Sequence, residues 1–221
     1  MPSAHRRHLL LGGAAFLLSG AQTAMAQAET ENVPCQKVFP FLENYLNLPA
    51  AERTHFRLLY RFSVTGAKLS DVRLILKHNG ETPITFGADG TPSPLPSQAA
   101  LKAKAPVALT RPKGSKIGVN MTVASSLPAA TSYTVTDLNK TVDQARSGAK
   151  KAAGLMGMAV PNFDRVVFSG VKSAQVVMSD GKTQALPVEK SGKPMFVPAS
   201  FPNAARVTLD AAPTLIGLGT K

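Results

Sequence analysis

The sequence predicts a mainly β protein with two antiparallel, sandwich-like β units linked by one long helix. Short segments with a two-residue apolar period recur along the chain, turn residues separate them, and one segment changes to a helical period. The expected organisation is a signal peptide at 1–26, an N-terminal β unit with a short leading helix at 27–130, a helical connector at 131–160 and a C-terminal β unit at 161–221.

The first 26 residues have the order of an export signal. MPSAHRRH is basic, LLLGGAAFLLS is apolar, and small residues follow up to Ala26. The pair Arg6-Arg7 suits the twin-arginine route, and the ordinary secretory route is the alternative. Both routes predict a periplasmic or secreted protein. No later apolar run approaches about 20 residues, so we expect no transmembrane segment after cleavage.

The charge balance favours anionic partners. The chain has 25 Lys+Arg against 13 Asp+Glu, and loss of the leader with its two arginines leaves 23 basic residues and a net charge of +10. Export argues against nucleic acid. We expect an anionic envelope component (a lipid headgroup, lipopolysaccharide or an acidic glycan) or an acidic protein. The alternative is that the charge only keeps the protein soluble.

The start of the mature chain predicts a flexible polar lead at 27–36 and a short helix at 37–48. The apolar side chains of that helix fall on one face. The single cysteine, Cys35, excludes an internal disulfide, and we expect it to be buried near this helix.

Two strands with a clear period follow, at 55–64 and 71–78. In THFRLLYRFSV every second residue is apolar or phenolic, and in DVRLILKH the same alternation separates Leu74 and Leu76 from Arg73 and Lys77. Further strands are expected near 84–86, 106–110, 116–124, 164–170 and 173–179 and in the last 30 or so residues. The prolines at 92–96 indicate an edge or a loop.

A helix is expected from about 137 onward. Leu138, Val142, Ala145, Ala149, Ala152 and Met156 form one helical stripe. Thr136 is the expected N-terminal cap. The small residues of the stripe allow close packing on the sheets, and an assembly partner that joins through this Ala-rich helix is the alternative. The following GLMGMAVP is interpreted as a buried connector, with a ligand-binding lip as the alternative.

An eight-residue pattern occurs twice. DGTPSPLP at 89–96 and DGKTQALP at 180–187 share D-G-x-x-x-x-L-P, and β-rich segments flank both copies in the same order. This indicates an internal duplication of one β unit. The alternative is coincidence, because Asp-Gly turns and Leu-Pro strand edges are common in β proteins.

The candidate binding site is the polar face of the first two clear strands. By alternation Arg57, Arg61, Arg73 and Lys77 lie on one water-exposed side if the strands are neighbours. Four cations so placed repel one another unless phosphates or carboxylates bind them, and arginine offers bidentate contacts. A solvated face that discourages edge pairing is the alternative.

Signals for catalysis are weak, so a non-catalytic binding protein is the main prediction. Two S-x-x-K pairs, Ser147 with Lys150 and Ser169 with Lys172, are the candidates for a small envelope serine hydrolase, but the companion motifs of penicillin-recognising enzymes are absent. His55 and His78 lack metal-ligand spacing, and we expect no metal and no cofactor.

Overall fold

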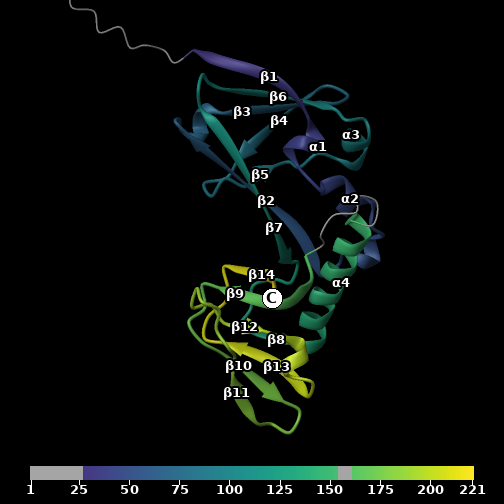
Figure 1. Cartoon of the computed structure of the whole chain (residues 1–221), viewed down its shortest axis with the longest axis vertical. Helices are drawn as coiled ribbons and strands as arrows, with labels where there is room; N and C mark the ends of the chain where they lie inside the picture. Colours follow the sequence, from purple (N-terminus) through teal and green to yellow (C-terminus); the bar gives the residue numbers. More distant parts are fainter. Residues whose placement is uncertain (1–26, 154–160) are drawn as a thin grey trace, which may run out of the picture.

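The computed structural model describes residues 27–153 and 161–221, and the chain is mainly β as predicted (Figure 1). The predicted signal peptide at 1–26 and most of the segment GLMGMAVP lie outside the described residues. Helices α1 (Cys35–Val38), α2 (Leu42–Asn47), α3 (Gln98–Lys102) and α4 (Val135–Ala153) and the 3-10 turns η1 (Ala50–Glu52), η2 (Leu69–Asp71) and η3 (Pro198–Ser200) accompany the strands.

The strands form three antiparallel sheets. The first sheet has the order β1-β6-β3-β4-β5, the second β12-β9-β14-β7-β2, and the third β11-β10-β13-β8. Their bounds are β1 (Ala28–Pro34), β2 (Phe56–Thr65), β3 (Arg73–Lys77), β4 (Glu81–Phe86), β5 (Pro92–Ser93), β6 (Pro106–Pro112), β7 (Lys116–Ser125), β8 (Ser132–Thr134), β9 (Phe163–Ser169), β10 (Ala174–Met178), β11 (Thr183–Ala185), β12 (Met195–Phe196), β13 (Ala204–Leu209) and β14 (Leu215–Thr220).

A long ribbon of β2 and β7 joins the two ends of the molecule. The two strands pair over ten residues each, from Phe56 with Ser125 to Thr65 with Lys116. The first sheet lies at one end of the ribbon and the third sheet at the other (Figure 1). Near the third sheet, β7 pairs with β14 through Ala124 and Gly217. The second sheet therefore contains strands from both halves of the chain, and strand pairing crosses the expected boundary at residue 130.

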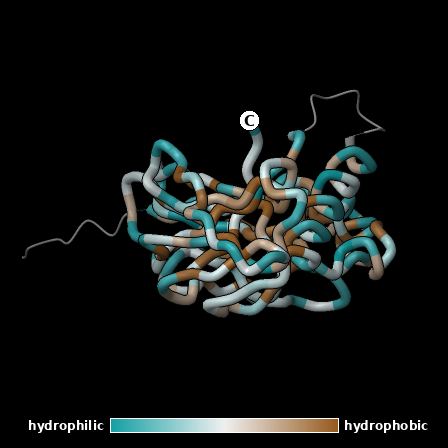
Figure 2. The backbone as a smooth tube through the Cα atoms, turned by 90° about the horizontal axis from the view of Figure 1, so that it is seen from below, coloured by the Kyte–Doolittle hydropathy of each residue, from teal (hydrophilic) through white to brown (hydrophobic). Residues whose placement is uncertain are grey.

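Two large hydrophobic cores lie on either side of a small cluster. In the first core β2 packs on the inner face of the first sheet, α1 and α3, and in the second core the second and third sheets pack together with α4. Leu48, Phe56, Ala145 and Phe163 form the small cluster between them. In the view down the long axis, hydrophobic segments lie mostly in the interior and hydrophilic segments form many of the outer turns (Figure 2).

The long helix begins earlier than predicted. Helix α4 starts at Val135, and the Thr134 hydroxyl accepts a hydrogen bond from the Asp137 N–H, so Thr134 and not Thr136 caps the helix. Asp137 lies in the first turn, and Lys150 and Lys151 in the last, as the helix dipole favours.

Two expectations for the start of the mature chain are wrong. Residues 28–34 are not a flexible lead but form β1, an edge strand that pairs with β6 over its whole length. The expected helix at 37–48 is two short helices, because Phe41 between them adopts a left-handed conformation (φ 64°). Cys35 is fully buried, as expected.

The repeated pattern forms two similar turns. Gly90 and Gly181 have φ values of 81° and 83°. Asp89 and Asp180 each accept a hydrogen bond from the backbone N–H two residues later. The strand orders around the two turns differ, since β4 lies between β3 and β5 but β10 lies between β13 and β11. The duplication therefore stays a prediction.

Candidate functional site

The four cations of the predicted anion-binding face are all exposed. Arg57 and Arg61 lie on β2, and Arg73 and Lys77 lie on β3. The alternation that predicted their exposure is confirmed at each position, because the residues between them are at least partly buried.

The expectation that these two strands are neighbours is wrong. Among the described strands β2 pairs with β7 alone, whereas β3 pairs with β4 and β6 in the first sheet. Tyr60 of β2 and Leu74 of β3 point into the same core from opposite layers. Because side chains alternate along a strand, the cations of the two strands point away from each other and do not form one patch.

Two of the four cations already have carboxylate partners. Arg61 Nη2 lies 3.4 Å from Asp89 Oδ2, and Lys77 Nζ lies 3.8 Å from Glu81 Oε1. The Thr91 hydroxyl and N–H, together with Arg61, lower the pKa of Asp89, so this acid stays charged beside its arginine. Anion binding by the four residues stays a prediction, without the shared face that motivated it.

The serine–lysine pairs are not assembled into a catalytic arrangement. Ser147 and Lys150 are exposed on α4, Ser169 lies in β9 and Lys172 in the turn after it. No side-chain hydrogen bond among the described residues joins either serine to its lysine. None of these four residues is among the described lining of the pocket described next.

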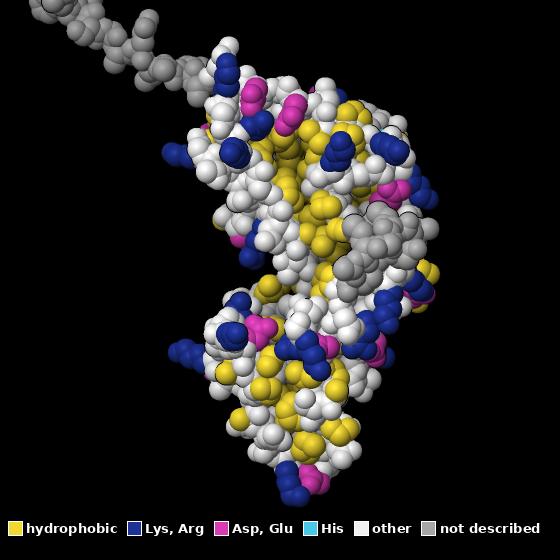
Figure 3. All heavy atoms as spheres, viewed as in Figure 1, with side chains coloured by type: hydrophobic (Ala, Val, Ile, Leu, Met, Phe, Trp, Pro, Cys, Tyr) yellow, Lys and Arg dark blue, Asp and Glu magenta, His cyan; other side chains and the backbone are white. Residues whose placement is uncertain are grey.

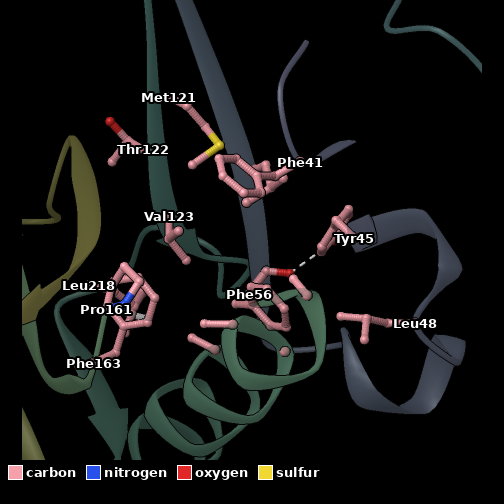
Figure 4. A pocket seen from close by; sticks show the side chains of 15 residues that line it. Phe41, Tyr45, Leu48, Phe56, Met121, Thr122, Val123, Pro161, Phe163 and Leu218 are labelled. Atoms are coloured by element: carbon pink, nitrogen blue, oxygen red, sulfur yellow. Dashed lines mark hydrogen bonds between the residues drawn. The ribbon is translucent and has the colours of Figure 1, made fainter. Parts of the chain in front are cut away.

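One concave site of the molecule is an apolar pocket of about 370 Å³ at the waist, the narrow middle between the first and third sheets, beside the small cluster (Figure 4). Helices α2 and α4 and strands β2, β7, β9 and β14 contribute to its wall. The described lining residues are Phe41, Tyr45, Leu48, Phe56, Leu58, Met121, Thr122, Val123, Ala145, Gly148, Ala149, Ala152, Pro161, Phe163 and Leu218. This volume and this apolar lining are typical of small-molecule sites.

The helical stripe predicted from the sequence serves two purposes. Leu138 and Val142, near the start of α4, are buried in the second core. Ala145 and Ala149, further along the same stripe, line the pocket. Small side chains at this end of α4 leave space that leucine or valine would fill, so the pocket results from a change of residue size along one stripe.

Gly148 allows α4 to approach the pocket floor closely. A Cβ atom there would lie 2.8 Å from Phe56 Cζ and 3.1 Å from Leu48 Cδ1. Glycine within a helix costs about 1 kcal/mol relative to alanine. The close approach to Phe56 is the packing reason for a glycine at this position.

Phe41 lines the pocket with an unusual backbone. Its φ of 64° is in the left-handed region, which costs a bulky residue about 1–2 kcal/mol. Its side chain is nevertheless exposed, and its ring lies beside Met121 (Figure 4). Backbone strain of this kind often marks a ligand-binding site, since the fold must hold the residue in place.

The strained backbone predicts that replacement of Phe41 lowers the affinity for a ligand more than it changes the free energy of unfolding. In Phe41→Gly the left-handed conformation becomes inexpensive, and this offsets the greater chain entropy of glycine, so we expect unfolding free energy to change by less than about 1 kcal/mol. The pocket loses an aromatic wall, so affinity for an apolar ligand should fall. Chemical denaturation and ligand titration of the variant measure the two effects. A large loss of stability would show that the Phe41 ring is a core residue instead.

The polar groups of the pocket wall are few and are largely satisfied. The Tyr45 hydroxyl donates to the Phe56 carbonyl at 3.0 Å, and the ring packs edge-on against Phe56 at 5.3 Å between centroids. Thr122 is the other hydroxyl among the described lining residues. This lining offers no carboxylate, imidazole or amine, so its chemistry is that of apolar binding.

Beside the pocket, polar contacts of Gln144 and Asp137 attach α4 to the segment before β2, and we call these contacts the polar seam. Gln144 accepts a hydrogen bond from the His55 N–H at 2.9 Å and donates to the Ala51 carbonyl at 3.0 Å. His55 Nε2 lies 3.5 Å from Asp137 Oδ1. The Thr134 hydroxyl, and secondarily His55, lower the pKa of Asp137, which keeps the carboxylate charged. The seam fixes one side of the pocket wall.

The sequence pattern places the pocket residues on separate elements and does not indicate a pocket. Phe56 and Leu58 were assigned to the core face of a strand and Ala145 and Ala149 to the packing face of a helix. The glycine at position 148 within that helix was the available signal for a close approach, although it does not indicate a cavity.

Within residues 27–153 and 161–221, no group of three or more His, Cys, Asp and Glu is placed to hold a metal ion. The helices of the same ranges include none that is long and apolar enough to span a membrane. No protein-family model matches the chain, and searches of the curated proteins and of the solved structures find no match.

Proposed function

We propose that this is an exported, non-catalytic binding protein that holds the apolar part of an anionic amphiphile of the cell envelope. The observation that carries the proposal is the apolar pocket at the waist, whose described lining has no charged side chain. A pocket of this kind favours an apolar ligand because burial of the ligand removes apolar surface from water.

The predicted export signal and the basic charge support the rest of the proposal. A net charge of +10 after removal of the leader favours an anionic ligand. Lys and Arg side chains gather on the α4 side of the waist (Figure 3). Hydrophobic side chains form a strip that runs from the end with the first sheet toward the waist. Among the expected partners, a lipid combines both properties, whereas an acidic glycan has no apolar part to fill the pocket.

The two alternatives have less support. For an assembly partner that joins through α4, the helix would need a free apolar stripe, but Leu138, Val142 and Ala145 of that stripe are buried within this chain. For a serine hydrolase, a lysine would need to contact its serine, and the described contacts of the two pairs include none. Binding is therefore the function that the pocket supports best.

A pocket-filling variant tests the proposal. Ala149→Leu places a larger side chain in the pocket, and we expect the affinity for the uncharged fluorophore N-phenyl-1-naphthylamine to fall about tenfold or more, since overfilling a packed site costs about 1–3 kcal/mol. Fluorescence titration of the purified mature protein measures the affinity.

Ser147→Leu is the matched control. It adds the same side chain to the exposed face of the same helix, so the affinity should not change. Equal affinities in the wild type and both variants, or no binding by the wild type, would reject the pocket as a ligand site.

A further inference from the structure

We propose that Arg53 binds the charged group of the ligand and that the ligand is a single-chain fatty carboxylate. The inference rests on the proposed function and adds to it the residue and the headgroup. In this proposal the anionic group is bound by one arginine beside the pocket wall. The four cations of β2 and β3, which point away from one another, do not take part.

Arg53 is fixed against two residues of the pocket wall. Its Cζ lies 5.5 Å from the centroid of the Tyr45 ring, and its Nε donates to the Leu48 carbonyl at 3.2 Å. Tyr45 and Leu48 both line the pocket on the α2 side (Figure 4). A cation over an aromatic face is held electrostatically by the ring, and a half-buried arginine keeps part of its surface in water. The guanidinium is thus positioned beside the pocket without a ligand.

The charge of Arg53 has no carboxylate partner among the described residues, whose ion pairs do not include it. The adjacent carboxylate, Glu52, pairs with Lys151 of α4. Arg146 also contacts the pocket wall, since its Nε donates to the Phe163 carbonyl, but its Nη1 lies 3.4 Å from Asp143. Of these two arginines beside the wall, Arg53 is therefore the one whose charge is not yet matched.

The chemistry of this arrangement fits a carboxylate. With Nε engaged, the two terminal nitrogens of Arg53 still present parallel N–H groups, which match a carboxylate in bidentate geometry. One unmatched positive charge balances one carboxylate, whereas a phosphate monoester carries a charge closer to −2 near neutral pH. The pocket volume of about 370 Å³ lies at the small end of ligand sites, which suits one chain and not two.

Displacement of N-phenyl-1-naphthylamine from the mature protein by dodecanoate, dodecyl phosphate and dodecan-1-ol tests the inference. For the wild type we expect dodecanoate to bind about 10- to 100-fold more tightly than the alcohol, with a smaller difference at high salt. Arg53→Gln should bind dodecanoate and the alcohol equally, and Arg53→Lys should retain part of the preference. Both variants should still bind the fluorophore, which shows that the pocket is intact.

Arg57→Gln is the control, because Arg57 is exposed on the face of β2 that points away from the pocket. It should keep the full preference for dodecanoate. An unchanged preference in Arg53→Gln, equal wild-type affinity for the acid and the alcohol, or tighter binding of dodecyl phosphate than of dodecanoate would overturn the inference while the apolar pocket remains. Failure of the wild type to bind the fluorophore or any of the three compounds would instead overturn the proposed function.

Discussion

Replacement of Gly90 by alanine is expected to destabilise the protein by about 3–5 kcal/mol. Gly90 is buried with φ 81°, and a Cβ atom there would lie 2.3 Å from the Phe62 carbonyl oxygen. The Gly90 carbonyl accepts a hydrogen bond from the Phe62 N–H at 2.9 Å, so the turn before β5 is attached to β2 at this point. The alanine must push two backbones apart, which also weakens this attachment.

Gly181→Ala is a control from within the same repeated pattern. Gly181 has nearly the same backbone angle, but a Cβ atom there would meet nothing within 4 Å. Only the left-handed conformation then opposes alanine, and we expect a loss of about 1–2 kcal/mol. Urea denaturation of both variants measures the difference. If Gly90→Ala is no more destabilising than Gly181→Ala, then β5 does not pack on β2 as described.

The Tyr60 phenol is expected to make the protein sensitive to alkaline pH. Tyr60 is 1 % exposed, packs edge-on against Phe39 and donates a hydrogen bond to the Pro40 carbonyl at 2.7 Å. Burial raises the pKa of Tyr60 well above its ordinary value of 10. The folded state therefore favours the neutral phenol, and its contribution to stability is complete below pH 10 and is lost as pH rises above that value.

This linkage has a measurable size and a suitable reference variant. Between pH 10 and pH 12 the unfolded chain loses a proton at Tyr60 that the folded chain keeps, so unfolding free energy should fall by about 2 kcal/mol from this group. Tyr60→Phe lacks the ionisable group, and it also leaves the Pro40 carbonyl without its donor, which costs about 1–3 kcal/mol at neutral pH. The difference in stability between wild type and Tyr60→Phe should therefore shrink by about 2 kcal/mol across that range.

Denaturant titrations of both proteins at several pH values test this expectation. All other tyrosines and lysines are common to the two proteins, so their ionisation cancels in the difference. Parallel stability curves between pH 10 and pH 12 would contradict it, because they would mean that the phenol ionises in the folded state as readily as in the unfolded chain.

Most of the secondary structure was predictable because burial repeats with a fixed period along it. The period of two at 56–64 predicted β2, and the stripe from Leu138 to Ala152 predicted α4. β1 was missed because AETENVP has little apolar character. It is an edge strand held mainly by backbone hydrogen bonds to β6, which leave no sequence pattern.

The predicted cationic face is wrong in one respect, which is the expected pairing of the two strands that carry the cations. The alternation correctly predicted that Arg57 and Arg73 are exposed, but it cannot specify which strand pairs with which. The two strands were expected to be neighbours, whereas β2 pairs with the distant β7 and β3 pairs with β4 and β6. Long-range pairing depends on how complete hydrophobic faces fit together, which is not a local property.

The sequence by itself determined the mainly β class, the basic charge and the inward face of the principal strands and of α4, since each follows from local composition or period. Only the tertiary structure decided that the cations of β2 and β3 lie on opposite layers, and that α2, α4 and the β2–β7 ribbon enclose an apolar pocket beside Arg53. The physical reason is that a cavity forms where side chains of distant segments fail to fill the space between backbones. The volume left there depends on all of those segments together.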